Sequence, residues 1–339
     1  MEINKILEGN CLSVLKTLPD NSIDCCITSP PYFGLRDYGE IEQIGLEETP
    51  EMFVAALIQV FAEVKRVLKE KGTLWLNIGD SYAHSMRQSG IIHAGKLAQK
   101  SKGQIKEGFK PLQKGYKEKD LIGIPWMLAF ALRTNGWYLR QDIIWAKPNP
   151  MPESVTDRCT KSHEYIFLLS RSLKYYYDYE SIKTPVADAS IQRLMQNIEN
   201  QKGSKQVPGK MNGVMKAVSG DRKYKDQSVI GKKLSSHSGG FYEDGSIVGN
   251  GMANKRSVWT VNTIPYSEAH FATFPQKLIV DCIKAGCPEN GIVLDPFMGA
   301  GTTALVARKL NRNFIGIELN PEYIKIANNR LFKELGMFA

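Results

Sequence analysis

Apolar and polar positions follow two patterns along this chain. Between residues 49 and 72 the apolar residues recur every three or four positions, which predicts an amphipathic helix that begins at Thr49-Pro50-Glu51 and ends at Lys71-Gly72. Short apolar runs without alternation are typical of buried strands, and they occur at 23–28, 73–78, 292–294 and 314–317. Further helical patterns cover a short segment before residue 19, the residues after Pro125, and 275–285, 302–310 and 321–331.

Strands and helices alternate along much of the chain, which predicts an α/β protein with a doubly wound, mostly parallel sheet and right-handed crossovers. Two more apolar runs, 138–145 and 164–169, flank a proline-rich turn. Because no long helix separates these two runs, we expect them to form an antiparallel pair at the edge of the sheet.

Charge adds two segments to this picture. The 339 residues carry a formal charge of +9, and the excess is concentrated in 84–119 and 199–258. We interpret 84–119 as a mobile basic loop, since it is too long for a plain connector. From 186 to 258 the apolar pattern weakens, so this region is a candidate insertion or small recognition domain between the segments 1–185 and 259–339. Two basic segments favour a polyanionic partner.

Several classes of protein are not expected from the composition. No run of about 18 apolar residues is present, so we predict no membrane-spanning helix. The N-terminus lacks a basic segment followed by an apolar one, so we expect no secretory signal. The six cysteines form no C-x-x-C pair and no His/Cys spacing typical of metal ligands. We therefore expect neither a zinc or other metal site nor a disulfide framework. A cytoplasmic protein with reduced thiols fits these features.

The run 23–28 ends in a turn, Ser29-Pro30-Pro31-Tyr32, whose chemistry is distinctive. Proline fixes φ and has no N–H, so the turn is stiff and its carbonyls are free to accept hydrogen bonds. Ser29 adds a hydroxyl and Tyr32 a flat ring. Hydrogen-bond acceptors beside a stacking surface would suit an amino group on a flat heterocycle. For this stretch taken alone, the alternative interpretation is a plain strand followed by a loop.

A second turn, from Asp295 through Gly299 and Gly301 to a helix beginning at Thr302, follows the run 292–294. Glycines allow close backbone approach, and a helix N-terminus favours anions. Glu318 follows Asp295 by 23 positions, close to the offset of the acid that binds ribose in dinucleotide sites. We therefore predict a nucleoside-containing cofactor. A nicotinamide site is disfavoured, because the chain from Gly301 onward has only 39 residues. These are too few for the usual six-stranded dinucleotide-binding domain unless the N-terminal half of the chain completes its sheet.

The segment Asp-Pro-Phe-Met-Gly-Ala-Gly-Thr at 295–302, with Thr-Ser-Pro-Pro-Tyr upstream at 28–32, resembles the S-adenosylmethionine-dependent amino-methyltransferases of DNA. The catalytic motif precedes the cofactor motif, as in their circularly permuted beta group. The resemblance implies a catalytic half at 1–185, a target-recognition region at 186–258 and a cofactor-binding half at 259–339. The resemblance covers 7–82, 121–185 and 266–331, and it implies a Rossmann-like methyltransferase fold. It also implies double-stranded DNA as substrate, and a cognate restriction endonuclease and a homodimer as further candidate partners.

The resemblance also implies roles for individual residues. The loop at 295–302 would wrap the methionine part of the cofactor, and Glu318 would hold the ribose hydroxyls. The segment 270–275 would help to seat the methionine carboxylate, and Asn10 would lie near the adenine. The implied cofactor-binding residues are Asn10, Thr28, His270, Phe271, Thr273, Asp295, Phe297, Gly299, Gly301, Thr302, Glu318 and Asn320.

Ser29, Pro30, Pro31 and Tyr32 would form the catalytic turn. Ser-Pro-Pro-Tyr is similar to the enzymes that methylate the exocyclic amino group of cytosine, whereas Asp-Pro-Pro-Tyr is commoner in adenine enzymes. Methylation at carbon 5 of cytosine is disfavoured because it requires a cysteine nucleophile at this turn. An adenine-directed enzyme, an enzyme acting on RNA or on a protein amide, and a non-catalytic DNA-binding module remain open.

Overall fold

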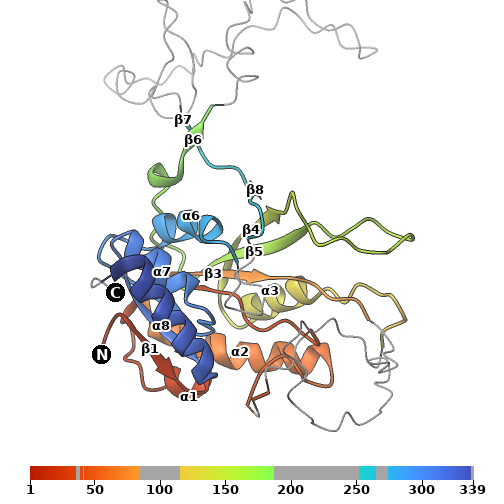
Figure 1. Cartoon of the computed structure of the whole chain (residues 1–339), viewed down its shortest axis with the longest axis horizontal. Helices are drawn as coiled ribbons and strands as arrows, with labels where there is room; N and C mark the ends of the chain where they lie inside the picture. Colours follow the sequence, from red (N-terminus) through yellow and green to blue (C-terminus); the bar gives the residue numbers. More distant parts are fainter. Residues whose placement is uncertain (36–38, 41, 84–114, 187–251, 265–273, 337–339) are drawn as a thin grey trace, which may run out of the picture. The chain divides into compact units, whose positions relative to one another are not determined.

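The protein is described by a computed structural model over residues 1–35, 39–40, 42–83, 115–186, 252–264 and 274–336. An eight-stranded mixed sheet forms its centre, in the order β1-β10-β9-β2-β3-β5-β4-β8 (Figure 1). The strands of this sheet are β1 (Lys5–Glu8), β2 (Ile23–Thr28), β3 (Leu68–Ile78), β4 (Tyr138–Ala146), β5 (His163–Ser170), β8 (Val258–Thr260), β9 (Ile292–Asp295) and β10 (Asn313–Glu318).

Every neighbouring pair in this sheet is parallel except the two pairs made by β5, which runs against both β3 and β4. The mostly parallel α/β sheet and its antiparallel pair are thus confirmed. The pair does not end the sheet, however, because β8 adds to β4 in parallel. β9 pairs directly with β2, so the N-terminal half completes the sheet of the C-terminal half.

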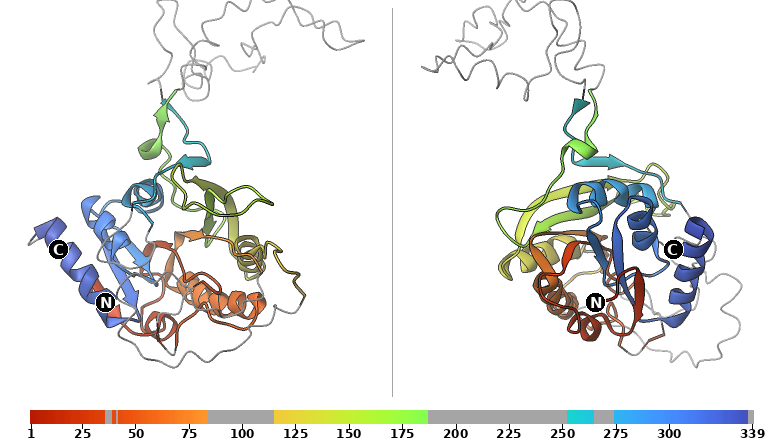
Figure 2. Two further views of the ribbon diagram at one scale, coloured as in Figure 1. Left: turned by 45° about the vertical axis from the view of Figure 1, so that its right-hand side comes forward. Right: turned by 90° about the vertical axis from the view of Figure 1, so that its left-hand side faces the viewer.

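Helices cover both faces of the sheet (Figure 2). Helices α1, α2 and α3 pack in succession against one another, as do α6, α7 and α8. Buried Phe53, Phe61 and Leu57 of α2 belong to the core that α2 shares with β2 and β3. The bounds of the helices are α1 (Cys11–Leu15), α2 (Pro50–Val67), α3 (Ile124–Thr134), α6 (Gln276–Gly286), α7 (Thr302–Lys309) and α8 (Pro321–Leu335).

One element boundary and one edge strand differ from the sequence prediction. Helix α2 ends at Val67 and the chain passes directly into β3 at Leu68, so the polar residues 69–72 belong to a strand and not to the helix. The strand β1 was not predicted, because its four residues carry too little pattern. Among the described strands it lies at the edge of the sheet and pairs with β10 alone.

By compactness the chain divides into two units, Met1–Ser181 with Arg256–Ala339, and Ile182–Lys255. The described part of the second unit contains the end of a short 3-10 helix, η2 (Glu180–Ile182), and the antiparallel pair β6 (Thr184–Pro185) and β7 (Met252–Ala253). Most of the candidate recognition region and of the basic loop 84–119 lies outside the described residues, so these assignments stay predictions. No described helix combines the length and apolar character needed to cross a membrane.

Candidate active site

The two predicted turns leave the sheet side by side at its carboxyl edge. β2 and β9 are parallel neighbours, with Cys26 opposite Leu294, so the segments that follow them emerge together. A hydrogen bond of 2.6 Å from the Thr28 hydroxyl to the Asp295 carboxylate joins their starting points. The carboxyl edge of an open parallel sheet is where such folds bind ligands.

Asp295 organises this joint from the interior. Its side chain is 1% exposed and accepts hydrogen bonds from the hydroxyls of Thr28 and Thr303 and from the Phe297 amide. Burial raises the pKa of Asp295 to about 6 despite these three donors. The polar atoms of Thr28 and Asp295 therefore bond to the protein itself and hold the loop 296–301 against the end of β2.

The loop 296–301 turns on two glycines with left-handed backbone. At Gly301, with φ of +78°, an added Cβ would lie 2.9 Å from the Ala327 Cβ, so the close packing of α8 requires glycine. At Gly299, with φ of +52°, an added Cβ would meet no described protein atom within 4 Å. Gly299 is thus needed for the turn, and its open side leaves room for a ligand beside the backbone.

Glu318, at the end of β10, bonds to the backbone of this loop. One carboxylate oxygen accepts the Gly299 amide at 2.7 Å and the other accepts the Asn320 amide at 3.0 Å. Burial raises the pKa of Glu318. Each oxygen retains a lone pair for a further donor, which fits the two hydroxyls of a ribose. The residues present therefore suit the nucleoside part of S-adenosylmethionine.

The side chains of three other predicted cofactor-binding residues form hydrogen bonds within the protein. Asn320 caps α8 by accepting the Glu322 amide, and Asn10 caps α1 by accepting two backbone amides. The Thr302 hydroxyl accepts a hydrogen bond of 2.9 Å from Arg330. Arg330 is 7% exposed, and its guanidinium also donates to the Ala300 carbonyl in the loop.

Arg330 could not be predicted from the sequence, because it lies in α8 and belongs to no motif. Asn10 is nevertheless close to the site, since the amide of the preceding Gly9 donates to the Glu318 carbonyl. Phe297 is half-buried and packs against the core. His270, Phe271 and Thr273 lie outside the described residues, and their predicted roles stay predictions.

The predicted catalytic turn, 29–32, packs against Gly45 and is partly accessible. Pro30 is buried, whereas Ser29, Pro31 and Tyr32 are half-buried. An added Cβ at Gly45 would lie 3.2 Å from the Tyr32 carbonyl oxygen, so Gly45 packs tightly beneath the turn. No residue in the described part of the chain hydrogen-bonds to the Ser29 hydroxyl.

The Tyr32 side chain is held at both its ring and its hydroxyl. An added Cβ at Gly79 would lie 2.8 Å from Tyr32 Cε2, so the ring lies against the Gly79 backbone. The hydroxyl donates to Glu164 Oε2 at 2.7 Å. Asn77 donates to the same oxygen at 3.1 Å, and Lys147 forms an ion pair with the other oxygen. Glu164 and Asn77 belong to no motif that could have revealed them in the sequence.

Two further features bear on metals and cavities. Within the described residues, no group of three or more His, Cys, Asp and Glu side chains is placed to hold a metal ion.

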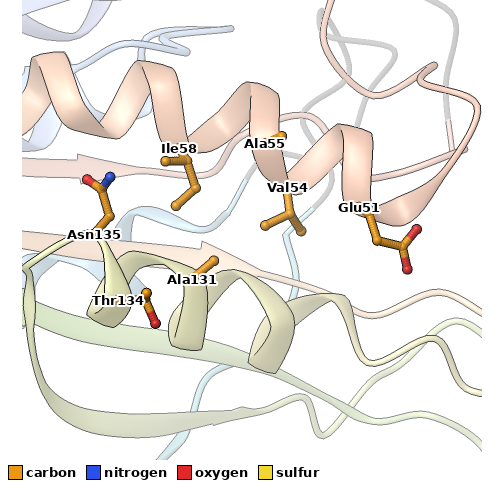
Figure 3. A pocket seen from close by; sticks show the side chains of 7 residues that line it. All are labelled: Glu51, Val54, Ala55, Ile58, Ala131, Thr134 and Asn135. Carbon is orange, nitrogen blue, oxygen red and sulfur yellow. The ribbon is translucent and has the colours of Figure 1, made fainter.

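A shallow depression lies between α2 and α3 (Figure 3). None of the predicted site residues lines this depression, which is bounded by Glu51, Val54, Ala55, Ile58, Ala131, Thr134 and Asn135.

Comparison with known proteins identifies the family of the chain. Residues 23–329 match the family described as DNA methylase. The type II methyltransferase M.Cfr9I of Citrobacter freundii is 44% identical over 335 residues, which cover 98% of this chain and 89% of the relative. The type II methyltransferase M.SmaI of Serratia marcescens is 42% identical over 329 residues, which cover 97% and 91%.

Two solved structures share the fold. The PvuII DNA methyltransferase (cytosine-N4-specific) has a TM-score of 0.57 at 16% identity, covering 98% of this chain and 90% of its own. A DNA modification methylase from Thermus thermophilus, complexed with S-adenosyl-L-methionine, has a TM-score of 0.53 at 18% identity, covering 98% and 96%. Because the family and its relatives span almost the whole sequence, the chain belongs to the DNA methylase family and is an S-adenosylmethionine-dependent DNA methyltransferase.

Proposed function

We propose that this enzyme methylates the exocyclic amino group of cytosine, at N4, within a specific sequence of duplex DNA. The observation that carries the proposal is the hydroxyl of Ser29, which no described residue engages and which lies one residue after the Thr28–Asp295 joint between the two turns. A neutral hydroxyl at this position, in place of a carboxylate, is the feature that the chain shares with cytosine enzymes.

The turn would act by accepting hydrogen bonds. The Ser29 hydroxyl and the Pro30 carbonyl would each accept one hydrogen of the target amino group, which draws its lone pair out of the ring and toward the methyl donor. Tyr32 would stack on a base swung out of the duplex, an extrusion that costs a few kcal/mol. Serine is too weak a base to take the proton, so the proton leaves to water after transfer.

S-adenosylmethionine, when bound, supplies a methyl group already activated on a sulfonium, so positioning contributes most of the rate. The chain would hold this group through the backbone of the loop 296–301 and through Glu318. Phe297 would add apolar contact. Direct transfer then needs no covalent intermediate with the enzyme.

The buried thiols support this route over methylation at carbon 5. Cys25 and Cys26 lie inside β2, and burial raises the pKa of each thiol well above its ordinary value. Cys287 is buried as well, and its pKa is raised for the same reason. A nucleophilic thiolate at the turn is therefore not available from these residues.

Product analysis tests the proposal. Duplex DNA treated with the protein and labelled cofactor is digested to nucleosides and analysed by mass spectrometry. We expect N4-methylcytosine from the wild-type protein, and little from Ser29→Ala although it still binds S-adenosylmethionine. N6-methyladenine would establish the adenine alternative instead, and absence of any transfer would indicate a non-catalytic DNA-binding module.

The biological setting is part of the same proposal. Two relatives are named type II methyltransferases, so we propose that the enzyme works in the cytoplasm beside a cognate restriction endonuclease. The region 186–258 would read the target sequence, and a homodimer is one arrangement to be tested by mass in solution. Sequencing of the modified DNA gives the base and its context in one experiment.

A further inference from the structure

We propose that Glu164 is the positioning residue for the Tyr32 ring, and that Lys147 holds Glu164 in place. The inference rests on the proposed role of Tyr32 as the platform for the extruded base. Glu164 and Lys147 lie outside the two turns, and the rate of methyl transfer depends on both.

Three donors converge on the Glu164 carboxylate. The Tyr32 hydroxyl and the Asn77 amide both donate to Oε2, at 2.7 and 3.1 Å, and Lys147 binds Oε1. The Glu164 side chain is only 14% exposed and that of Lys147 18%, so this ion pair is largely removed from solvent. A hydrogen bond from tyrosine to a charged, desolvated carboxylate is stronger than one between neutral groups.

The strand register explains why these residues meet. Asn77 lies in β3 opposite Ile166 of β5, two residues along the strand from Glu164 and on the same face. Lys147 follows β4 immediately, and its amide donates to the Ser162 carbonyl across the hairpin. The β4–β5 hairpin therefore delivers the charge pair to the carboxyl edge at which Tyr32 emerges.

The Glu164 carboxylate does not need the hydrogen bond from Tyr32 to compensate for its partial burial. Asn77 and Lys147 already supply an amide donor and a compensating charge. The added bond to Tyr32 fixes the ring, whose neighbouring surface is the Gly79 backbone. A platform held in one orientation before the base arrives avoids the ordering cost that a free side chain would bear on binding.

A double-mutant cycle tests this coupling. The variants are Tyr32→Phe, Glu164→Ala, the double variant, and Glu164→Gln, which keeps an acceptor for the hydroxyl. We measure the single-turnover rate of methyl transfer to duplex DNA at saturating cofactor, and separately the affinity for S-adenosylmethionine. Glu63→Ala is the matched control, because Glu63 is also an ion-paired carboxylate but lies in α2, bonded to Arg66.

We expect Tyr32→Phe and Glu164→Ala each to slow transfer by roughly tenfold, the worth of one charge-assisted hydrogen bond. The double variant should be no slower than Glu164→Ala, Glu164→Gln should recover part of the rate, and cofactor affinity should stay at the wild-type value. If the rate loss of the double variant equals the product of the two single rate losses, the proposal is overturned. A loss of cofactor affinity as large as the loss of rate would also overturn it.

A structural arm separates this inference from the proposed function. If the wild-type protein transfers no methyl group to DNA, the proposed function fails. Crystal structures of the wild-type protein and Glu164→Ala then still decide the positioning role. A displaced or multiply oriented Tyr32 ring in the variant supports it, and an unmoved ring overturns it.

Discussion

Replacing the buried carboxylate of Asp295 by an amide should remove part of the pH dependence of folding. Asp295 is 1% exposed, and burial raises its pKa to about 6, from an ordinary value of 3.8. In Asp295→Asn the amide keeps an acceptor for Thr28 and for the Phe297 amide. The Thr303 hydroxyl can turn to accept from the new NH2 group.

The sign follows from proton binding. Between pH 4 and 6 the folded protein holds a proton on Asp295 that the unfolded chain has lost, so the free energy of unfolding falls as pH rises. A shift from 3.8 to about 6 corresponds to a total loss of about 3 kcal/mol at neutral pH. About 1.4 kcal/mol of this loss falls between pH 5 and 7.5.

Urea unfolding at pH 5 and at pH 7.5 measures the effect for both proteins. The wild-type protein should lose about 1.4 kcal/mol more than Asp295→Asn over this interval. Asp142→Asn makes the same chemical change on the exposed surface of β4 and provides the background. Equal pH dependence in the wild-type protein and Asp295→Asn would refute the reasoning that Asp295 is ionised at a cost inside the fold.

Three further predictions concern the site. Gly301→Ala should destabilise the protein by more than Gly299→Ala in urea unfolding, because both have positive φ but only Gly301 meets the Ala327 Cβ; equal losses would contradict this. Tyr32→Ala should reduce methyl transfer far more than the affinity for S-adenosylmethionine measured by calorimetry, and equal losses would mean that Tyr32 is structural. Glu318→Gln should weaken binding of S-adenosylmethionine roughly tenfold, the worth of a hydrogen bond to a charged group, and unchanged affinity would remove Glu318 from the cofactor site.

The central strands could be predicted because they are buried on both faces. Residues 23–28 and 292–294 form short, mainly apolar runs, and a buried run of this kind has few alternatives to a parallel strand. The strand β1 and the start of β3 could not be predicted in this way. Their residues are partly exposed or polar, and pairing with a neighbouring strand, which is a tertiary contact, decides their conformation.

The two turns were found from the sequence because proline restricts the backbone locally and glycine frees it. The residues that support the turns could not be found in this way. Glu164 reaches Tyr32 only through the register of β3, β5 and β4, and Arg330 reaches the cofactor loop only through the packing of α8. Neither of these two contacts can be predicted from the spacing of the residues along the sequence. The inward-facing roles of Thr28 and Asp295 likewise required the pairing of β2 with β9.

The most direct test of the account is a crystal structure of the protein with duplex DNA and a non-reactive analogue of S-adenosylmethionine. We predict a cytosine outside the duplex, stacked on Tyr32, with its amino nitrogen within hydrogen-bond distance of the Ser29 hydroxyl and facing the analogue on the loop 296–301. An analogue bound elsewhere, or an extruded base that contacts neither Ser29 nor Tyr32, would contradict it.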